Sequence, residues 1–322
     1  MDFYKKIISS RSLRQKILFH LGFIPDKAMT SLQYRIKTGR RIDWRHPKRY
    51  TEKLQVYKTY YRNPLMVTCS DKADVRGYVA DRGLSRLLNE LYGVYDSCDE
   101  IDFDALPAAF VAKDTLGDGA GVSVLICRNK TSLDRKKFER TLRRWTSTPH
   151  NKPCGGREWP YYSGKKHRIL IEKYIESEAE EGGLIDYKFF CFNGEPKYLY
   201  VMTNRSNPQG PSIGIYDAEF HLTPYRRTGR DPLPRPIPKP DNFNEMLDAA
   251  RRLSEPFPHV RVDLYNPNGK LLFGELTFFS GTGYTTFTPD EFDYILGEEF
   301  HLPAEIHPCG NNRALSRHPQ RP

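Results

Sequence analysis

Cysteines are few in this sequence, and none forms a C-x-x-C pair. Closely spaced cysteines are the usual ligands of structural zinc, and regular cysteine patterns mark the disulfide frameworks of small secreted domains. The six cysteines are instead scattered along the chain, at Cys69, Cys98, Cys127, Cys154, Cys191 and Cys309. This pattern argues against a zinc site and predicts free thiols in the reducing cytoplasm.

Long apolar runs are also missing. No segment approaches the roughly 20 apolar residues that span a bilayer, so we expect no transmembrane helix. Residues 1–23 carry lysines but have neither a long apolar core nor a small-residue cleavage site. We therefore expect no signal peptide.

The same N-terminal stretch is basic and amphipathic. Such a segment could contact the inner face of the membrane or a membrane-bound assembly machinery. More often it packs on its own domain, and we favour that interpretation. Its apolar positions are Ile7, Ile8, Ile17, Leu18 and Leu21, and its basic positions are Lys5, Lys6, Arg11, Arg14 and Lys16.

Acidic side chains are outnumbered by basic ones. The formal net charge is +10 over 322 residues, and the isoelectric point is about 9.2. This excess favours acidic partners such as a nucleotide, an acidic polysaccharide or an anionic membrane. No nucleic-acid-binding signature is present, so we expect no nucleic-acid partner. The length is sufficient for two domains.

The most informative stretch is residues 257–284. Between residues 260 and 264, apolar side chains alternate with Arg261 and Asp263, which predicts a strand with one apolar and one charged face. The turn sequence Asn-Pro-Asn-Gly at 266–269 separates it from a second strand that carries Glu275. The sequence thus predicts a β-hairpin that brings Asp263 and Glu275 together.

The side on which Glu275 lies depends on the register of this hairpin. Arg261 and Asp263 share a face, and Glu275 joins it only if paired residue numbers sum to an even value. That requires an odd-length loop, such as 266–270, or a β-bulge. Two carboxylates among apolar strands need a positive partner. The partner could be Arg261 in an ordinary ion pair, or a hard cation such as Mg²⁺, which prefers oxygen ligands.

A glycine-rich segment, Asp-Thr-Leu-Gly-Asp-Gly-Ala-Gly at 114–121, follows a predicted strand that ends in Lys113. Glycines at alternate positions let backbone N–H groups converge on an anion, and Lys113 could add a point charge. The segment is not a Walker A loop, because the lysine precedes it and a strand follows it. A plain flexible turn is the alternative.

Three other features carry two interpretations each. Lys72 and Arg76 are spaced i,i+4 and could face one anion, but a solvated helix face is favoured by spacing alone. Lys188 is a lone cation in an aromatic strand, where it could also snorkel to the sheet edge. The aromatic residues of the insert at 146–166 could stack on a sugar, but we favour a packing role for them. These aromatics are Trp159, Tyr161 and Tyr162.

Taken in chain order, these pieces resemble the ATP-grasp fold, and in particular its TupA-like branch, named for teichuronopeptide synthesis. The resemblance covers roughly residues 25–300. The segments that carry it are PKRYTEKLQVYK, CSDKADVRGYV, FVAKDTLGDGAG, GREWPYYSGKKHRILIEKYI, DYKFFCFNGEPKYLYV, RVDLYNPNGKLLFGELTFFSGTGY and TPDEFDYILG.

The resemblance implies an α+β fold of two lobes with the nucleotide between them. We expect a helical N-terminal region at 1–62, an N-terminal lobe with the glycine-rich loop at 63–168, and a C-terminal lobe with the metal-binding hairpin at 169–302. The polar tail at 303–322 is expected to be disordered.

The resemblance also implies how the nucleotide, ATP, is held. Lys113 resembles the lysine that binds the α- and β-phosphates. Residues 172–175 resemble the strand between the lobes: the Glu172 side chain would lie beside the adenine, and backbone groups of Lys173 and Ile175, on either side of Tyr174, would read its edge. The loop that closes over the β- and γ-phosphates would contain Gly117, Gly119 and Gly121.

At the hairpin, the resemblance implies a catalytic centre. Asp263 and Glu275 would hold Mg²⁺, together with Thr277, which stands where many ATP-grasp enzymes have asparagine. Lys188 resembles a contact to the γ-phosphate. Arg261 would stabilise the phosphoryl group during transfer.

The implied activity is that of an ATP-dependent carboxylate–amine ligase of cell-surface polysaccharide assembly. Its substrates would be a uronic acid or another acidic polymer component, and an amine or amino acid. Two alternatives remain. A glycosyltransferase-type enzyme would release nucleoside mono- or diphosphate from a sugar donor, whereas a non-catalytic polysaccharide-binding protein would lose only stability on substitution of Asp263 or Glu275.

Overall fold

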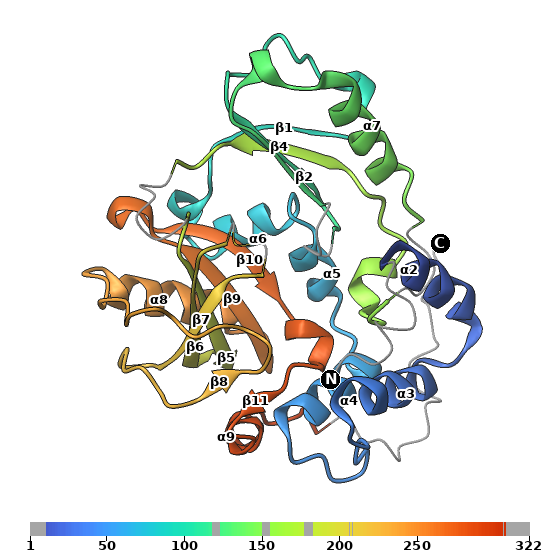
Figure 1. Cartoon of the computed structure of the whole chain (residues 1–322), viewed down its shortest axis with the longest axis vertical. Coiled ribbons are helices and arrows are strands. Elements are labelled where there is room, and N and C mark those ends of the chain that lie inside the picture. Colours follow the sequence, from blue (N-terminus) through green and yellow to red (C-terminus); the bar gives the residue numbers. More distant parts are fainter. Residues whose placement is uncertain are drawn as a thin grey trace, which may run out of the picture.

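The computed structural model describes residues 11–117, 123–149, 155–176, 183–205, 207, 209–304 and 306. Within these ranges the chain forms a four-stranded sheet, a five-stranded sheet and a two-stranded pair, with helices around them (Figure 1). All paired strands are antiparallel. The predicted α+β class is confirmed.

The four-stranded sheet has its own small core. Its spatial order is β1 (Leu91–Tyr95), β4 (Ile169–Lys173), β2 (Phe110–Asp114) and β3 (Val124–Cys127). The apolar side of α7 (Arg135–Thr146) packs on it, and Asp134 caps this helix by accepting from Lys137 N at 3.0 Å. Because β4 lies between β1 and β2, the predicted lobe boundary at residue 168 cuts through this sheet.

The five-stranded sheet carries the larger core. Its order is β10 (Leu272–Thr277), β9 (His259–Tyr265), β5 (Asp186–Phe192), β6 (Glu195–Thr203) and β7 (Ser212–Asp217). One face packs on α8 (Phe243–Ser254), where Phe189 contacts Phe243. The apolar residues of β9 point to this face, and its charged residues therefore point to the opposite one, as alternation predicts.

Several helices come from the first third of the chain, and those from α4 onward contribute residues to the larger core. They are α2 (Arg11–His20), α3 (Asp26–Thr38), α4 (Tyr50–Tyr60), α5 (Pro64–Ser70) and α6 (Val75–Asp81). Thr51 at the start of α4 donates both its N–H and its hydroxyl to Asp293 of α9 (Glu291–Glu299), at 2.9 and 2.8 Å. Residues of α4 to α6 are buried in the same cluster as the five-stranded sheet, so the predicted division at residue 62 is not a packing boundary.

Short elements complete the fold. They are the strands β8 (Arg226–Arg227) and β11 (Phe287–Thr288) and the 3₁₀ helices η1 (Leu21–Phe23), η2 (Ser85–Leu87), η3 (Cys98–Glu100), η4 (Lys130–Ser132), η5 (Trp159–Tyr162), η7 (Pro267–Gly269) and η8 (Ser280–Gly283). Trp159 of η5 packs against the larger core, and Tyr162 Oη donates to Asp26 Oδ2 at 3.1 Å. Both contacts agree with the packing role favoured for these aromatics.

Several expectations concern surface and composition. Cys69, Cys98, Cys127 and Cys191 are buried free thiols, as predicted, whereas Cys154 and Cys309 lie outside the described residues. In the described part of the chain, every helix is too short or too polar to cross a membrane. Ile306 of the predicted tail is buried in the larger core, and residues 307–322 lie outside the described ranges.

Candidate active site

A β-bulge sets the register of the β9–β10 hairpin. Phe273 lies opposite Leu264, but one pair further Glu275 lies opposite Asp263, so Gly274 is the extra residue. A Cβ atom at Gly274 would lie 2.8 Å from the Asp263 carbonyl oxygen, a distance that no side chain tolerates. The bulge changes the sum of paired numbers from odd to even. Asp263 and Glu275 therefore share one face, and of the two predicted routes to this register the bulge is the one used.

One row of polar side chains crosses four strands of this face. Glu275 of β10 lies opposite Asp263 of β9, Asp263 lies opposite Lys188 of β5, and Lys188 lies opposite Tyr200 of β6. Residues directly opposite each other in a sheet point to the same side, with Cβ atoms about 5 Å apart. The structure thus brings together three predicted site residues and adds Tyr200, which the sequence interpretation missed.

Asp263 is almost fully buried, with 1% of its side chain exposed. Arg261 Nε donates to its Oδ1 at 2.6 Å, Arg261 Nη2 donates to its Oδ2 at 2.7 Å, and Lys188 Nζ also donates to Oδ2. Burial by itself would raise the pKa of Asp263. The charges and hydrogen bonds of Arg261 and Lys188 outweigh it and lower this pKa below its usual value.

Glu275 is more open, with 45% of its side chain exposed. Its Oε1 accepts from Thr277 Oγ1 at 3.2 Å and lies 3.6 Å from Arg261 Nη2, which also donates to Thr277 Oγ1 at 3.0 Å. Arg261 thus lies among Asp263, Glu275 and Thr277, as the ion-pair interpretation predicts. The same three residues offer oxygen ligands of the type that Mg²⁺ prefers, with Glu275 the accessible one.

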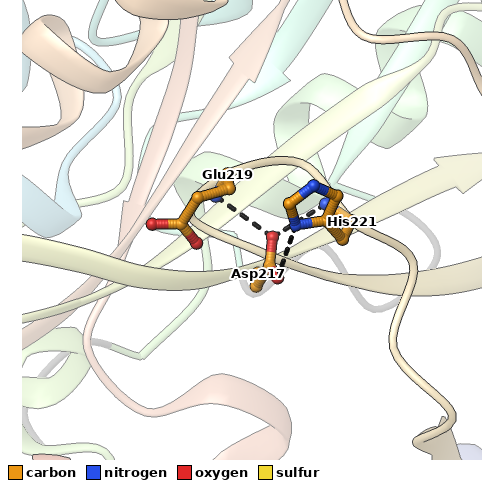
Figure 2. A group of neighbouring side chains, drawn as sticks. All are labelled: Asp217, Glu219 and His221. Carbon is orange, nitrogen blue, oxygen red and sulfur yellow. Dashed lines mark hydrogen bonds and ion pairs between the residues drawn. The ribbon is translucent and has the colours of Figure 1, made fainter.

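A second group of candidate ligands lies at the end of β7. The Asp217, Glu219 and His221 side chains place their ligand atoms within 4.8 Å of one another (Figure 2). Asp217 Oδ1 accepts from the backbone N–H groups of Glu219 and His221, and His221 Nδ1 lies 3.1 Å from Asp217 Oδ2. These bonds explain the group as a turn closed by an aspartate on the surface.

Lys113 and Lys72 supply positive charge next to the glycine-rich segment. Lys113, at the end of β2, forms an ion pair with Glu172 of β4. Lys72 Nζ donates to Gly117 O at 2.7 Å. Burial lowers the pKa of Lys72, the charge of Glu275 opposes this shift, and the charge of Lys113 adds to it. Because its amino group is bonded to Gly117 O and its side chain is partly buried, the interpretation of Lys72 as part of a solvated helix face is wrong.

The glycine-rich segment is described only at its base. A Cβ atom at Gly117 would lie 2.2 Å from Ser123 Cβ, so the two ends of the segment approach closely there. Asp114 at this base lies 2.8 Å from His167 Nδ1, and Thr115 N donates to Arg168 O at 3.0 Å. Gly119 and Gly121, which were expected to cover the phosphates, lie outside the described residues.

The predicted adenine-reading segment continues from β4. Glu172 is buried beside Lys113, as stated above, and Tyr174 and Ile175 are partly buried. The N–H of Lys173 donates to Glu90 O at 2.9 Å, and its carbonyl oxygen accepts from Asn89 Nδ2 at 2.8 Å. An adenine edge at Lys173 would have to replace these partners, so Ile175 is the better candidate for backbone recognition.

Hydrogen bonds from α4 and from Arg261 of β9 hold the segment after β10. Gln55 Nε2 donates to Gly283 O at 2.7 Å, Lys58 Nζ donates to Thr282 O at 3.1 Å, and Arg261 Nη1 donates to Ser280 Oγ at 2.8 Å. Gly281, Thr282 and Gly283 all have positive φ angles. The segment η8 is therefore a fixed turn that connects the charged row to the helical region.

Lys58→Met should change how stability depends on pH. Burial, with the charges of Lys37 and Arg157 adding to it, lowers the pKa of Lys58 to about 7. Between about pH 7 and the usual lysine value near 10.4, the unfolded chain binds a proton that the folded chain does not, so wild-type stability rises with pH in this window. The melting temperature of Lys58→Met should exceed that of the wild type most at pH 6.5, and the difference should shrink towards pH 10. A gap that stays constant with pH would contradict this assignment.

Two surface cavities lie away from the charged row. One of about 590 Å³ lies beside Arg251, and one of about 560 Å³ lies beside Asn242. Neither is lined by a residue of the row, so the candidate site rests on its charges and hydrogen bonds.

Comparison with known proteins gives one family. A family profile described as TupA-like ATPgrasp matches residues 52–301. A search of curated proteins gave no match.

Several solved structures resemble the chain in part. D-alanine–D-alanine ligase from Bacillus anthracis is 15% identical with a TM-score of 0.41; the match covers 66% of this chain and 57% of the ligase. L-amino acid ligase from Bacillus licheniformis is 16% identical with a TM-score of 0.40, over 68% of this chain and 45% of that one. D-alanine–D-alanine ligase from Helicobacter pylori is 12% identical with a TM-score of 0.41, and the match covers 79% of this chain and 65% of that ligase. The chain thus spans less than two thirds of the length of each.

Proposed function

Because the chain belongs to the TupA-like ATP-grasp family, we propose that it is an ATP-dependent ligase that joins a carboxylate to an amine. The acid would be a uronic acid or another acidic component of a cell-surface polysaccharide, and the second substrate an amine or amino acid. The carboxylate attacks the γ-phosphorus of ATP and releases ADP. The amine then attacks the acyl carbon of the acyl-phosphate, loses a proton, and displaces phosphate to leave an amide.

The observation that carries this proposal is the row Glu275–Asp263–Lys188 with Arg261 beside it. A triphosphate and an attacking carboxylate are both anionic, so their approach requires fixed positive charge that does not reorganise during the reaction. Lys188 and Arg261 are held rigidly by Asp263 and can meet the charge of the transferring phosphoryl group. Bound Mg²⁺ would neutralise phosphate oxygens, with Asp263, Glu275 and Thr277 as its protein ligands.

We assign nucleotide binding to the four-stranded sheet, which carries Lys113 and Glu172. Lys113 would contact the α- and β-phosphates, and Lys72 joins it because its amino group donates to Gly117 O at the base of the glycine-rich segment. Glu172 and the backbone of Ile175 would lie along the adenine. Residues of the glycine-rich loop would cover the phosphates and exclude water, which an acyl-phosphate intermediate requires. These loop residues are Gly117, Gly119 and Gly121.

The decisive experiment is an ADP-release screen of uronic acids against amines and amino acids with Mg²⁺ and ATP. We expect ADP and phosphate to appear in equal amounts only when an acid and an amine are both present. Release of nucleoside mono- or diphosphate from a sugar nucleotide, without ATP consumption, would instead support a glycosyltransferase. A chain that binds polysaccharide but releases neither product would support a non-catalytic protein.

Lys113→Ala should weaken ATP binding by about tenfold to a hundredfold, because it removes a charge-assisted contact to phosphate. Titration calorimetry with a non-hydrolysable ATP analogue and Mg²⁺ measures this loss. Lys136→Ala on the exposed side of α7 is the matched control, since it removes the same charge far from the row. Equal affinity of the two variants would contradict the phosphate role of Lys113.

The proposal also places the enzyme in the cytoplasm, in peripheral contact with the inner face of the membrane or its assembly machinery. Apolar side chains exposed in α2 and η1 support this, with Phe23 82%, Leu13 49% and Ile17 37% exposed. Ile7 and Ile8, from the same amphipathic segment, lie outside the described residues. Flotation with vesicles that contain anionic lipid tests the contact, and failure to float with them would contradict it.

A further inference from the structure

Arg227 has no acidic partner within the part of the chain that the structure describes. It belongs to β8, which pairs with β11 through the contact of Arg227 with Phe287. Its side chain is partly buried, and among the described residues its guanidinium group has no hydrogen bond and no ion pair. Burial lowers the pKa of Arg227, Tyr200 opposes this shift, and the positive charges of Arg230 and Arg261 add to it. An unpaired guanidinium group beside two others is electrostatically unfavourable.

Tyr200 is a second donor for which the described residues offer no acceptor. It is 1% exposed, and its buried hydroxyl group has no hydrogen-bond partner among these residues. Burial raises the pKa of Tyr200 to about 12, while the charges of Arg227 and Arg261 act in the opposite direction. Both guanidinium groups thus act on the phenol electrostatically. Buried hydroxyl groups are nearly always hydrogen-bonded, so an orphaned one beside an orphaned cation indicates a missing ligand.

The two orphaned groups adjoin the proposed reaction centre. Tyr200 lies directly opposite Lys188 in the sheet. Arg261 reaches from Asp263 to Ser280 of η8, and Arg227 Nη2 lies 3.9 Å from the position that a Cβ atom would take at Gly281 in the same turn. Arg227 and Arg261 thus both reach η8, and Tyr200 lies one strand spacing from Lys188 on the face that also carries Arg261.

We infer that Arg227 and the Tyr200 hydroxyl group, with Arg261 behind them, form an anion subsite that holds a carboxylate of the acid substrate. A carboxylate has two acceptor oxygens, one for the guanidinium group and one for the phenol, and such charge-assisted bonds are the strongest a protein offers. A strand spacing from Lys188 is within reach of the phosphoryl group that Lys188 would contact. The identity of the carboxylate as substrate rests on the proposed ligase function; the anion subsite itself does not.

The test uses the purified full chain and D-glucuronate, with D-glucose as the neutral control at constant ionic strength. We expect glucuronate, but not glucose, to raise the wild-type melting temperature. Arg227→Met should weaken glucuronate binding by about tenfold or more, and Tyr200→Phe should weaken it severalfold. Arg226→Met, the exposed neighbour on β8, is the matched control and should bind like the wild type.

Stability without ligand separates a binding role from a structural one. Arg227→Met should melt no lower than the wild type when glucuronate is absent, because it removes an unpaired cation, and Tyr200→Phe removes only an unpartnered hydroxyl group. Wild-type affinity for glucuronate in both variants, no glucuronate effect on the wild type, or destabilisation of both variants without ligand would each overturn the subsite.

Affinity for the ATP analogue with Mg²⁺, measured on the same samples, distinguishes this inference from the ligase proposal. Glucuronate binding that depends on Arg227 in a chain that does not bind ATP would keep the anion subsite and reject the ligase. ATP binding without an Arg227-dependent glucuronate effect would keep the ligase proposal and reject the anion subsite.

Discussion

Glu275→Gln should lower the rate of ADP formation by about a thousandfold while the melting temperature changes by only a few degrees. Glu275 is 45% exposed and lies 3.6 Å from its cationic neighbour Arg261, so its ion pair contributes at most about 1 kcal/mol to stability. In turnover, however, it would supply the accessible negative charge that holds Mg²⁺ at the phosphates. Loss of about 4 kcal/mol of transition-state stabilisation corresponds to the stated factor.

The measurement is steady-state ADP release with the acid and amine pair that the screen identifies, together with a melting curve. Glu195→Gln is the matched control: Glu195 also belongs to the five-stranded sheet, is exposed, and pairs with Arg251 at 3.1 Å. It should keep wild-type turnover. Full turnover in Glu275→Gln would remove Glu275 from the metal site and leave the Arg261 ion pair as the whole explanation of the hairpin.

The hairpin could be predicted because its signals are local. Alternation along β9 fixes which residues share a face, and the turn at 266–269 fixes where the chain reverses. Counting alone shows that Asp263 and Glu275 share a face only with an odd-length loop or a bulge, and the structure has the bulge. Gly274, inside β10, is the extra residue of the bulge, and its lack of a Cβ atom permits the close contact with the Asp263 carbonyl group.

Residues whose meaning comes from distant partners could not be predicted in the same way. Tyr200 is one of two tyrosines in β6, and only the pairing of this strand with β5 distinguishes it by placing it opposite Lys188. Lys72 has the spacing of a solvated helix face, but its amino group contacts Gly117, 45 residues away in the sequence. Arg227 lies in a loop-rich stretch without periodicity, so no sequence pattern marks it.

The lobe boundary expected at residue 168 rests on the family resemblance and not on a local signal. In the structure, β4 begins just after this boundary but pairs with β1 and β2, which precede it. Lys113 of β2 lies opposite Leu170 of β4, and Tyr95 of β1 lies opposite Ile169. Strand order in a sheet is set by contacts between distant segments, which neither composition nor local spacing records.

Asp263→Asn should lower the free energy of unfolding by about 3–5 kcal/mol, the range found when one partner of a buried ion pair is removed. Asp263 is 1% exposed and accepts from Arg261 and Lys188. An amide cannot compensate two cations, so Arg261 and Lys188 would be left with a net positive charge in the sheet. Urea unfolding at pH 7 measures the loss, and a loss below about 1 kcal/mol would contradict the described pair.

The pH dependence of this loss follows from the lowered pKa of Asp263. A carboxylate whose pKa is lower in the folded than in the unfolded chain stabilises the fold above the unfolded value, near 3.9, and this contribution disappears as pH falls through the folded value. The unfolding free energies of wild type and Asp263→Asn should therefore differ fully at pH 6 and converge below about pH 4. A difference that persists unchanged at low pH would mean that the variant loses packing and not charge.

A second substitution separates the charge from the shape of the side chain. Adding Arg261→Met to Asp263→Asn removes one of the two uncompensated cations and fills its space with an apolar chain, so the double variant should be more stable than Asp263→Asn alone. Arg261→Met alone should be destabilising, because Asp263 then keeps only Lys188. Partial recovery in the double variant, with no recovery of turnover, would show that the same ion pair stabilises the sheet and holds the cations that the reaction requires.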